Sequence, residues 1–159
     1  MIEIALHTFL TNPSDGNQTQ TARNTARNSL AGAIGNRVWI GRRPQESLTP
    51  SMTLLRLSSE RYNDLYGEPT CVPSTVDLTI WGRQDQYSPG GIIEAATEWL
   101  RLALTQYRGA MGTLDIQGTT IINERMITPV APTDASDNWL FGYTTDFLIH
   151  HSQSGVTAL

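Results

Sequence analysis

Three histidines are the side chains of this sequence best suited to bind a metal ion or to exchange protons near neutral pH. His7 lies in an apolar N-terminal stretch, and His150 and His151 are adjacent to each other. Adjacent residues of a strand point to opposite faces, so His150 and His151 cannot share a zinc site within a strand. We therefore expect the histidines to be structural or surface residues, and no metal site is predicted.

The other candidates for chemistry also have simpler structural explanations. Cys71 is the single cysteine, so neither an internal disulfide nor a cysteine cluster for zinc is possible. Glu94 and Glu98 are four residues apart and would share a helix face. Two carboxylates in this position are more often solvated surface groups than a catalytic acid–base pair. The run Ser-Pro-Gly-Gly at 88–91 lacks the spacing of a phosphate-binding loop and fits a helix cap. The sequence predicts no enzyme and no cofactor.

Arginine is the remaining chemically distinctive residue type, because all eleven basic residues are arginine. Arginine suits interfaces through its planar, bidentate contacts, although genomic base composition is an equal explanation for the missing lysine. A protein partner fits the arginines around Trp39 better than nucleic acid, which needs several stacking rings. The candidate interface residues are Arg37, Trp39, Arg42 and Arg43 on a basic side, and Asp85, Glu94 and Glu98 on an acidic side. Simple solvation is the alternative for each of them.

The charge is unevenly distributed along the chain. The net charge is -4, which argues against a broad nucleic-acid-binding surface. Residues 1–61 contain seven arginines and four acidic residues, whereas residues 62–159 contain four arginines and eleven acidic residues. A molecule with one basic and one acidic flank can stack on copies of itself, and a chance fluctuation on a solvated surface is the alternative.

Length and hydropathy predict one soluble domain. The 159 residues match the size of a single domain that buries an ordinary hydrophobic core. No stretch approaches the roughly 18 unbroken apolar residues of a membrane span. The start MIEIALHTFL lacks the cationic region and cleavage site of a secretory signal, so we expect a cytoplasmic chain.

Two helices are predicted. The first is short and ends at Asn12-Pro13, and residues 12–28 are then expected to form a mobile polar insertion. One or two helical turns in TARNTARNSLAGAI, at 21–34, are the alternative. The second helix, at 89–108, carries an apolar stripe at spacings of three and four, with Ser88 and Pro89 at its start and Gly109 at its end.

Alternation of apolar and polar residues predicts strands over 37–41, 52–61, 74–83, 113–127 and 138–151. The strands 52–61 and 74–83 form an antiparallel pair across a long loop, and Gly118 interrupts the strand 113–127. Segregated strands and helices predict an α+β fold. Its sheet is mostly antiparallel and is packed on one face by the long helix and the short N-terminal helix.

Read in order, these elements resemble the tail-completion or tail-terminator family of long-tailed bacteriophages. The resemblance covers most of the chain, except residues 12–28 and the last few residues. It is carried by MIEIALHTFL, GNRVW at 35–39, SSERYNDLYG at 58–67, VDLTIWGR at 76–83, the helix IIEAATEWLRLAL and YTTDFLIHH at 143–151.

The resemblance implies a structural protein of the virion neck, assembled in the host cytoplasm. Such proteins form a ring, usually of six copies, which docks on the last ring of tail-tube protein, stops polymerisation and offers a surface to the head connector. DNA would pass through the lumen without specific binding, and residual acidity suits that passage. Loops at 12–28, 43–51, 62–73 and 128–138 are the expected docking elements.

Two other functions stay open at the level of sequence. One alternative is a head-side connector or stopper protein of the same neck. A small binding module unrelated to virions is the other alternative, although the acidic balance disfavours nucleic acid as its ligand.

Overall fold

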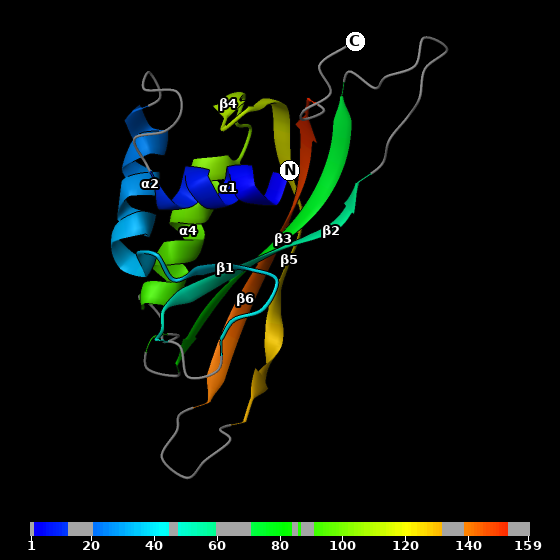
Figure 1. The fold of residues 1–159 in the computed structure, drawn as a ribbon. Coiled ribbons are helices and arrows are strands. Elements are labelled where there is room, and N and C mark those ends of the chain that lie inside the picture. The colour runs from blue at the N-terminus through cyan, green and yellow to red at the C-terminus, as the bar shows by residue number, and fades with distance from the viewer. Residues whose placement is uncertain are drawn as a thin grey trace.

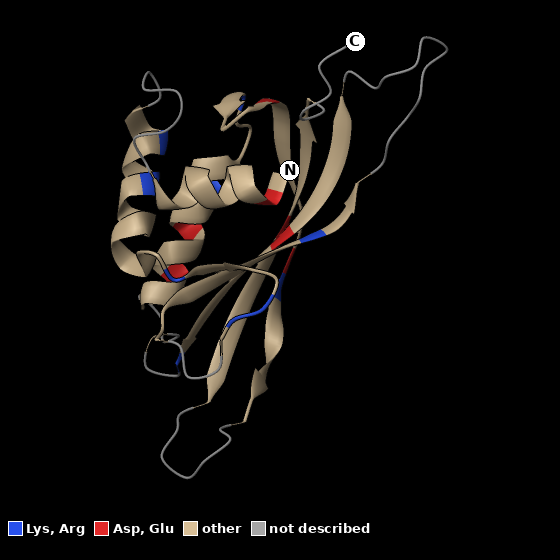
Figure 2. Ribbon diagram, in the orientation of Figure 1, with Lys and Arg blue, Asp and Glu red and all other residues tan. Residues whose placement is uncertain are grey.

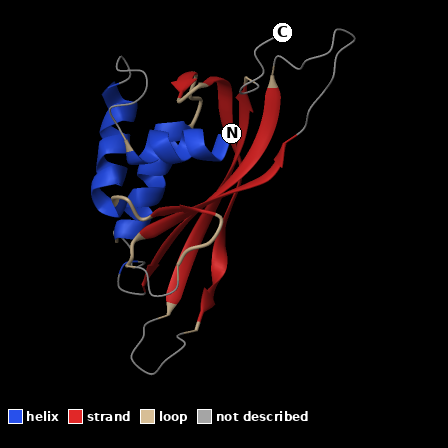
Figure 3. Ribbon diagram, in the orientation of Figure 1, coloured by secondary structure: helices blue, strands red, loops and turns tan. Residues whose placement is uncertain are grey.

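The computed structural model describes residues 2–12, 21–44, 48–59, 71–83, 86, 91–131 and 139–152. Helices gather on one side of a strongly twisted sheet (Figures 1 and 3). The elements follow in the order α1 (Ile2–Thr11), α2 (Thr21–Ile34), β1 (Val38–Ile40), β2 (Ser51–Ser59), β3 (Val72–Arg83), α4 (Ile92–Leu104), β4 (Gly109–Met111), β5 (Leu114–Val130) and β6 (Leu140–His151).

The sheet has six strands in the order β1-β2-β3-β6-β5-β4. β1 pairs with β2 in parallel, with Val38 opposite Met52, and the other neighbouring strands are antiparallel. The parallel pair arises because the segment 41–50 is long enough to return the chain to the end at which β1 began, which a tight hairpin turn cannot do.

The α+β class is therefore confirmed, with two corrections. The sheet is mixed, where a mostly antiparallel sheet was expected, and the described residues place three helices over it where two were expected. The antiparallel β2–β3 pair is confirmed, with Val76, Leu78 and Ile80 buried on its inner face. The expected interruption at Gly118 is a register shift in the pairing of β5 with β6.

The long helix is confirmed but is shorter than predicted. Ser88 and Pro89 lie outside the described residues, and Gly91 occupies the N-cap position without a side-chain cap. The helix ends at Leu104, and Gln106 takes the left-handed conformation with φ of 55°. Gly109 also has a positive φ, of 127°, but it belongs to β4 and does not close the helix. The chain turns early because Tyr107 is buried and donates to Ala110 O at 2.5 Å.

The polar repeat at 21–28 is helical, which corrects the prediction of a mobile insertion for this part. Residues 13–20 of the insertion lie outside the described residues. Arg27 of α2 is 1% exposed, and its guanidinium stacks on Phe9 with Cζ 3.6 Å from the ring centre. Arg27 Nε and Nη2 donate to Phe9 O at 3.0 and 2.7 Å, and Nη2 donates to Asn12 O at 3.2 Å. A buried arginine thus anchors a helix that composition alone does not predict.

In the part of the chain that the structure describes, α1, α2 and α4 each have an arginine bonded to carbonyls at or near the C-terminal end. Arg27 donates to carbonyls at the end of α1, as described above. Arg23, one helical turn earlier in α2, donates to Ala103 O at 2.8 Å and Thr105 O at 3.1 Å at the end of α4. Arg37 donates to Ala33 O at 2.8 Å near the end of α2. Cations at these positions satisfy carbonyls that lack a helical partner and oppose the negative end of the helix dipole.

The hydrophobic core lies between the sheet and the helices. The inner faces of β3 and β6 meet α1 and α4 there, and Leu6, Leu78, Leu100 and Phe147 are each 1% exposed or less. The loops predicted at 43–51, 62–73 and 128–138 lie partly outside the described residues, and Ser51, Val72 and Val130 of these ranges belong to strands. The hairpin of β5 and β6 extends beyond the helical layer, at the bottom of Figure 1.

Candidate protein interface

The predicted basic side is only partly available to a partner. Arg37 donates through Nε to Pro50 O at 2.8 Å as well as to Ala33 O, so its guanidinium ties β1 to the start of β2. Arg43 Nε donates to Ser51 Oγ at 3.2 Å. Burial, and then the charge of Arg83, lower the pKa of Arg43. Arg37 therefore binds backbone carbonyls and Arg43 a serine hydroxyl of their own chain, which the sequence did not indicate.

Trp39 and Arg42 remain accessible at the edge of the sheet. Val38 points into the core, so Trp39 lies on the face away from the helices, next to Thr53 in the β1–β2 register. Thr53 accepts a hydrogen bond from Trp81 Nε1 at 3.0 Å. Arg42 is exposed in the loop after β1. Figure 2 shows basic residues of this loop in blue. Trp39 and Arg42 are therefore the members of the basic group best placed to contact a partner.

The residues of the predicted acidic side also differ in their surroundings. Asp85 lies outside the described residues, and Glu94 and Glu98 are exposed on α4. Glu98 pairs with Arg101, which also donates to Glu124 of β5 with Nε 2.6 Å from Oε1. The hydrogen bond to Glu124 raises the pKa of Arg101. Glu98 is not brought to the basic group, because it reaches β5 through Arg101, and β2, β3 and β6 separate β5 from β1.

A third charged group, not predicted from the sequence, lies on the sheet face away from the helices. Asp77 of β3 is directly opposite Asp146 of β6. Arg125 of β5 bridges the two carboxylates, at 3.4 Å from Asp77 and 2.8 Å from Asp146. Burial, with a smaller contribution from Asp146, raises the pKa of Asp77, and Asp146 Oδ1 is buried without a hydrogen-bond partner among the described residues. The two acids are 69 positions apart in the chain, and only the pairing of β3 with β6 brings them together.

His151 closes a buried chain of hydrogen bonds between the ends of three strands. Its Nδ1 donates to Ser152 O at 2.7 Å, so the neutral ring accepts at Nε2 from Ser74 Oγ, also at 2.7 Å. Ser74 in turn pairs with Ser59 Oγ at 2.7 Å. His150 belongs to the opposite face, as the sequence predicted for two adjacent strand residues. The chain joins β2, β3 and β6 at one end of the sheet.

Stability is expected to fall below neutral pH because of His151. Burial lowers the pKa of His151 below its ordinary value of 6.5, and this effect exceeds the opposite one of the Ser152 carbonyl. The folded state therefore binds fewer protons than the unfolded chain once the pH falls below about 6.5, so stability is full above that value and is lost toward pH 5. Urea unfolding at pH 8 and pH 5 should show a smaller loss for His151→Gln than for the wild type; equal losses would contradict the assignment.

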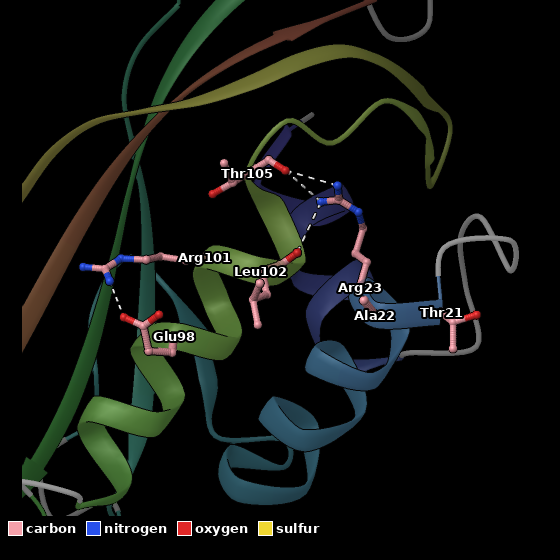
Figure 4. A pocket seen from close by; sticks show the side chains of 7 residues that line it. All are labelled: Thr21, Ala22, Arg23, Glu98, Arg101, Leu102 and Thr105. Atoms are coloured by element: carbon pink, nitrogen blue, oxygen red, sulfur yellow. Dashed lines mark hydrogen bonds and ion pairs between the residues drawn. The ribbon is translucent and has the colours of Figure 1, made fainter.

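A shallow groove lies between the start of α2 and the end of α4 (Figure 4). It encloses about 610 Å³ and is lined by Thr21, Ala22, Arg23, Glu98, Arg101, Leu102 and Thr105. Arg23 donates hydrogen bonds to the carbonyls at the end of α4, and Arg101 forms ion pairs with Glu98 and Glu124. The charged groups of the groove therefore connect structural elements to one another.

Exposed apolar side chains are found along the sheet edges. Ile40 of β1 and Leu55 and Leu57 of β2 are 49, 48 and 51% exposed. On β5, Ile122, Met126 and Val130 are 52, 46 and 47% exposed.

The described residues contain no group of three or more His, Cys, Asp or Glu side chains arranged to hold a metal ion. None of their helices has the length and apolar character that crossing a membrane would require.

The sequence matches no protein-family model and no curated protein. The fold, however, is similar to that of a solved chain described as "Virion of native gene transfer agent (GTA) particle". The two structures superpose with a TM-score of 0.53 at 12% sequence identity, and the match covers 84% of this chain and 94% of that chain. A TM-score above 0.5 over most of both chains shows a shared fold.

Proposed function

We propose that this protein is a structural component of a phage-like virion, a tail terminator that caps the tail tube as a ring. The observation that carries the proposal is the fold shared with a chain of a gene transfer agent virion over 94% of that chain. The order of sequence motifs that resembles the tail-terminator family supports it independently. Fold alone does not imply function, so the argument also needs a surface suited to assembly.

Accessible side chains at the β1 edge of the sheet suit assembly into a ring. Residues 37–44 and 48–59, around β1 and β2, contain four arginines and no acidic residue. Arg37 and Arg43 bond to their own chain and Arg56 pairs with Glu3, whereas Arg42 is exposed. A contact between two different patches on identical subunits closes into a ring when the rotation allows it. Trp39 and Arg42 are proposed to contribute to such contacts, since large aromatic and arginine side chains dominate interface energies.

In this proposal the ring, of six copies in the related family, binds the end of the tail tube and ends its polymerisation. The virion neck is its location, and tail-tube protein and head connector are its partners. The net charge of -4 suits a lumen through which DNA slides without specific binding. No covalent chemistry is part of this function, which depends on contacts alone.

Electron microscopy of the purified protein mixed with tail tubes tests the proposal. Rings are expected, both free and at one end of the tubes, and tubes assembled in their presence should stop growing. A protein that remains monomeric at high concentration and does not bind tubes would contradict it.

A head-side connector or stopper is the second candidate, because the description of the structural neighbour names a whole virion and not a position within it. Co-sedimentation separates the two candidates. A terminator is expected to sediment with purified tails, and a stopper with the portal-side complex of the head.

A further inference from the structure

Two carboxyl groups face each other on the central strands of the sheet, on the side away from the helices. Asp77 of β3 and Asp146 of β6 are direct register partners, and residues placed in this way have Cβ atoms within roughly 4.5–5.5 Å. Their side chains are 14 and 9% exposed. Two negative charges that are this close and this far removed from water disfavour each other, so the pair resists double ionisation.

Arg125 of β5 is the single positive charge that the described residues bring to this pair. Its Nη1 atom lies 2.8 Å from Asp146 Oδ2, and its Nη2 atom lies 3.4 Å from Asp77 Oδ2. The side chain of Arg125 is 47% exposed, so water screens its charge. The guanidinium therefore neutralises Asp146 better than Asp77.

The neighbouring strands add no further charge on this face, within the residues that the structure describes. The charged side chains of Arg56 on β2 and Glu124 on β5 pair on the other face, with Glu3 and Arg101 of the helices. The uncharged neighbours of the two acids are Leu55 of β2, Thr75 and Thr79 of β3, Thr144 and Leu148 of β6, and Asn123 of β5.

Hydrogen-bond donors reach three of the four carboxyl oxygens. Thr79 Oγ1 donates to Asp77 Oδ1 at 2.8 Å, and Arg125 reaches Asp77 Oδ2. Asp146 Oδ2 accepts from Arg125 and, at 3.4 Å, from Asn123 Nδ2. The fourth oxygen, Asp146 Oδ1, is buried and has no donor among the described residues. A buried acceptor without a donor is costly, so this oxygen requires a proton that the listed donors do not supply.

From this geometry we infer that Asp77 and Asp146 hold one proton between them, which forms a hydrogen bond from the Asp77 carboxyl group to Asp146 Oδ1 and makes a proton-sensitive contact between β3 and β6. The proton supplies the donor that Asp146 Oδ1 lacks, and it leaves one carboxylate for one guanidinium. It is placed on Asp77 because Arg125 lies closer to Asp146, and a carboxylate is the stronger partner of a guanidinium. This contact is independent of any assembly into a ring.

The shared proton makes the contact depend on pH. Burial is the main cause that raises the pKa of Asp77 above its ordinary value of 3.8, and the charge and hydrogen bond of Asp146 act in the same direction. Above 3.8 the folded chain therefore binds more protons at this pair than the unfolded chain does. The contribution of the pair to stability is full below that value and is lost as the pH rises through the pKa of folded Asp77. The sign is opposite to that of His151.

Carboxyl carbon NMR of the full-length chain, titrated with acid, tests the inference. In the wild type the titration midpoint of Asp77 is expected above 3.8. In Asp146→Asn it should move down, because the neighbouring charge is gone and the amide can donate to the Asp77 carboxylate. Asp115→Asn removes an exposed acid of β5 and is the matched control, in which the midpoint of Asp77 should not change. A wild-type midpoint at or below 3.8, or one that Asp146→Asn leaves unchanged, would overturn the inference.

Stability gives a second readout through a variant that imitates the protonated state. Asp77→Asn carries a permanent donor toward Asp146 Oδ1 and keeps an acceptor for Thr79. In urea unfolding at pH 8 this variant is expected to be at least as stable as the wild type, whereas Asp146→Asn, which removes the closest partner of Arg125, should be less stable. An Asp77→Asn variant less stable than the wild type at pH 8 would overturn the inference, because it would show that the fold depends on an ionised Asp77.

Discussion

Replacement of Arg27 by alanine is expected to lower the free energy of unfolding by about 3–5 kcal/mol. This loss combines the cost of buried carbonyls left without a donor with the cost of the cavity left by the side chain. The guanidinium donates to Phe9 O and Asn12 O at the end of α1, and it stacks on the Phe9 ring. Its removal leaves these carbonyls without their donor in a site where the arginine is 1% exposed. Urea unfolding followed by circular dichroism measures the loss.

Two variants show whether the geometry of the guanidinium is responsible. Arg27→Lys keeps a positive charge but loses the planar fork, so an intermediate loss of about 2 kcal/mol is expected. Arg108→Ala removes an exposed arginine and should stay within about 0.5 kcal/mol of the wild type. A loss below about 1 kcal/mol for Arg27→Ala would show that the repeat TARNTARN does not depend on this anchor.

Replacement of Gly82 by alanine is expected to destabilise the fold by about 1–3 kcal/mol through overpacking. A Cβ atom at this position of β3 would lie 2.2 Å from Ile93 Cδ1 and 2.7 Å from Ile93 Cγ1. Ile93 is 1% exposed in the first turn of α4, so it has little room to move. The glycine therefore sets how closely the long helix approaches the sheet. The change is measured by thermal and urea unfolding.

The partner substitution and a second glycine provide the controls. Ile93→Val removes the Cδ1 atom, so it should cost less in the Gly82→Ala background than in the wild type, where it costs about 0.5–1.5 kcal/mol. Gly32→Ala, on the exposed side of α2 with no atom within 4 Å of the new Cβ, should instead stabilise the helix by up to about 1 kcal/mol. Equal effects of the two glycine substitutions would contradict the packing argument.

The interface residues predicted from the sequence have different roles in the structure. Arg37 and Arg43 hold backbone and hydroxyl groups of their own chain, whereas Trp39 and Arg42 stay accessible. An arginine looks the same in the sequence whether it contacts a partner or a carbonyl of its own subunit. The distinction depends on backbone acceptors, which every residue carries and no motif marks.

Local periodicity was sufficient for the elements that have a strong apolar stripe. The N-terminal helix, the long helix and the strands around Val76 and Phe147 were predictable, because their side-chain spacing alone determines which face can be buried. The uneven charge was also evident from the chain itself.

Contacts between residues far apart in the chain determine the features that hydrophobic periodicity could not predict. The helix α2 contains too few apolar residues to be predicted as ordered, and it is held by Arg23 and Arg27 on carbonyls about 80 and 18 residues away. The parallel β1–β2 pair and the meeting of Asp77 with Asp146 follow from strand order and register. Periodicity reports which side of an element faces the core, but hydrogen-bond partners and sheet edges depend on residues brought together only by folding.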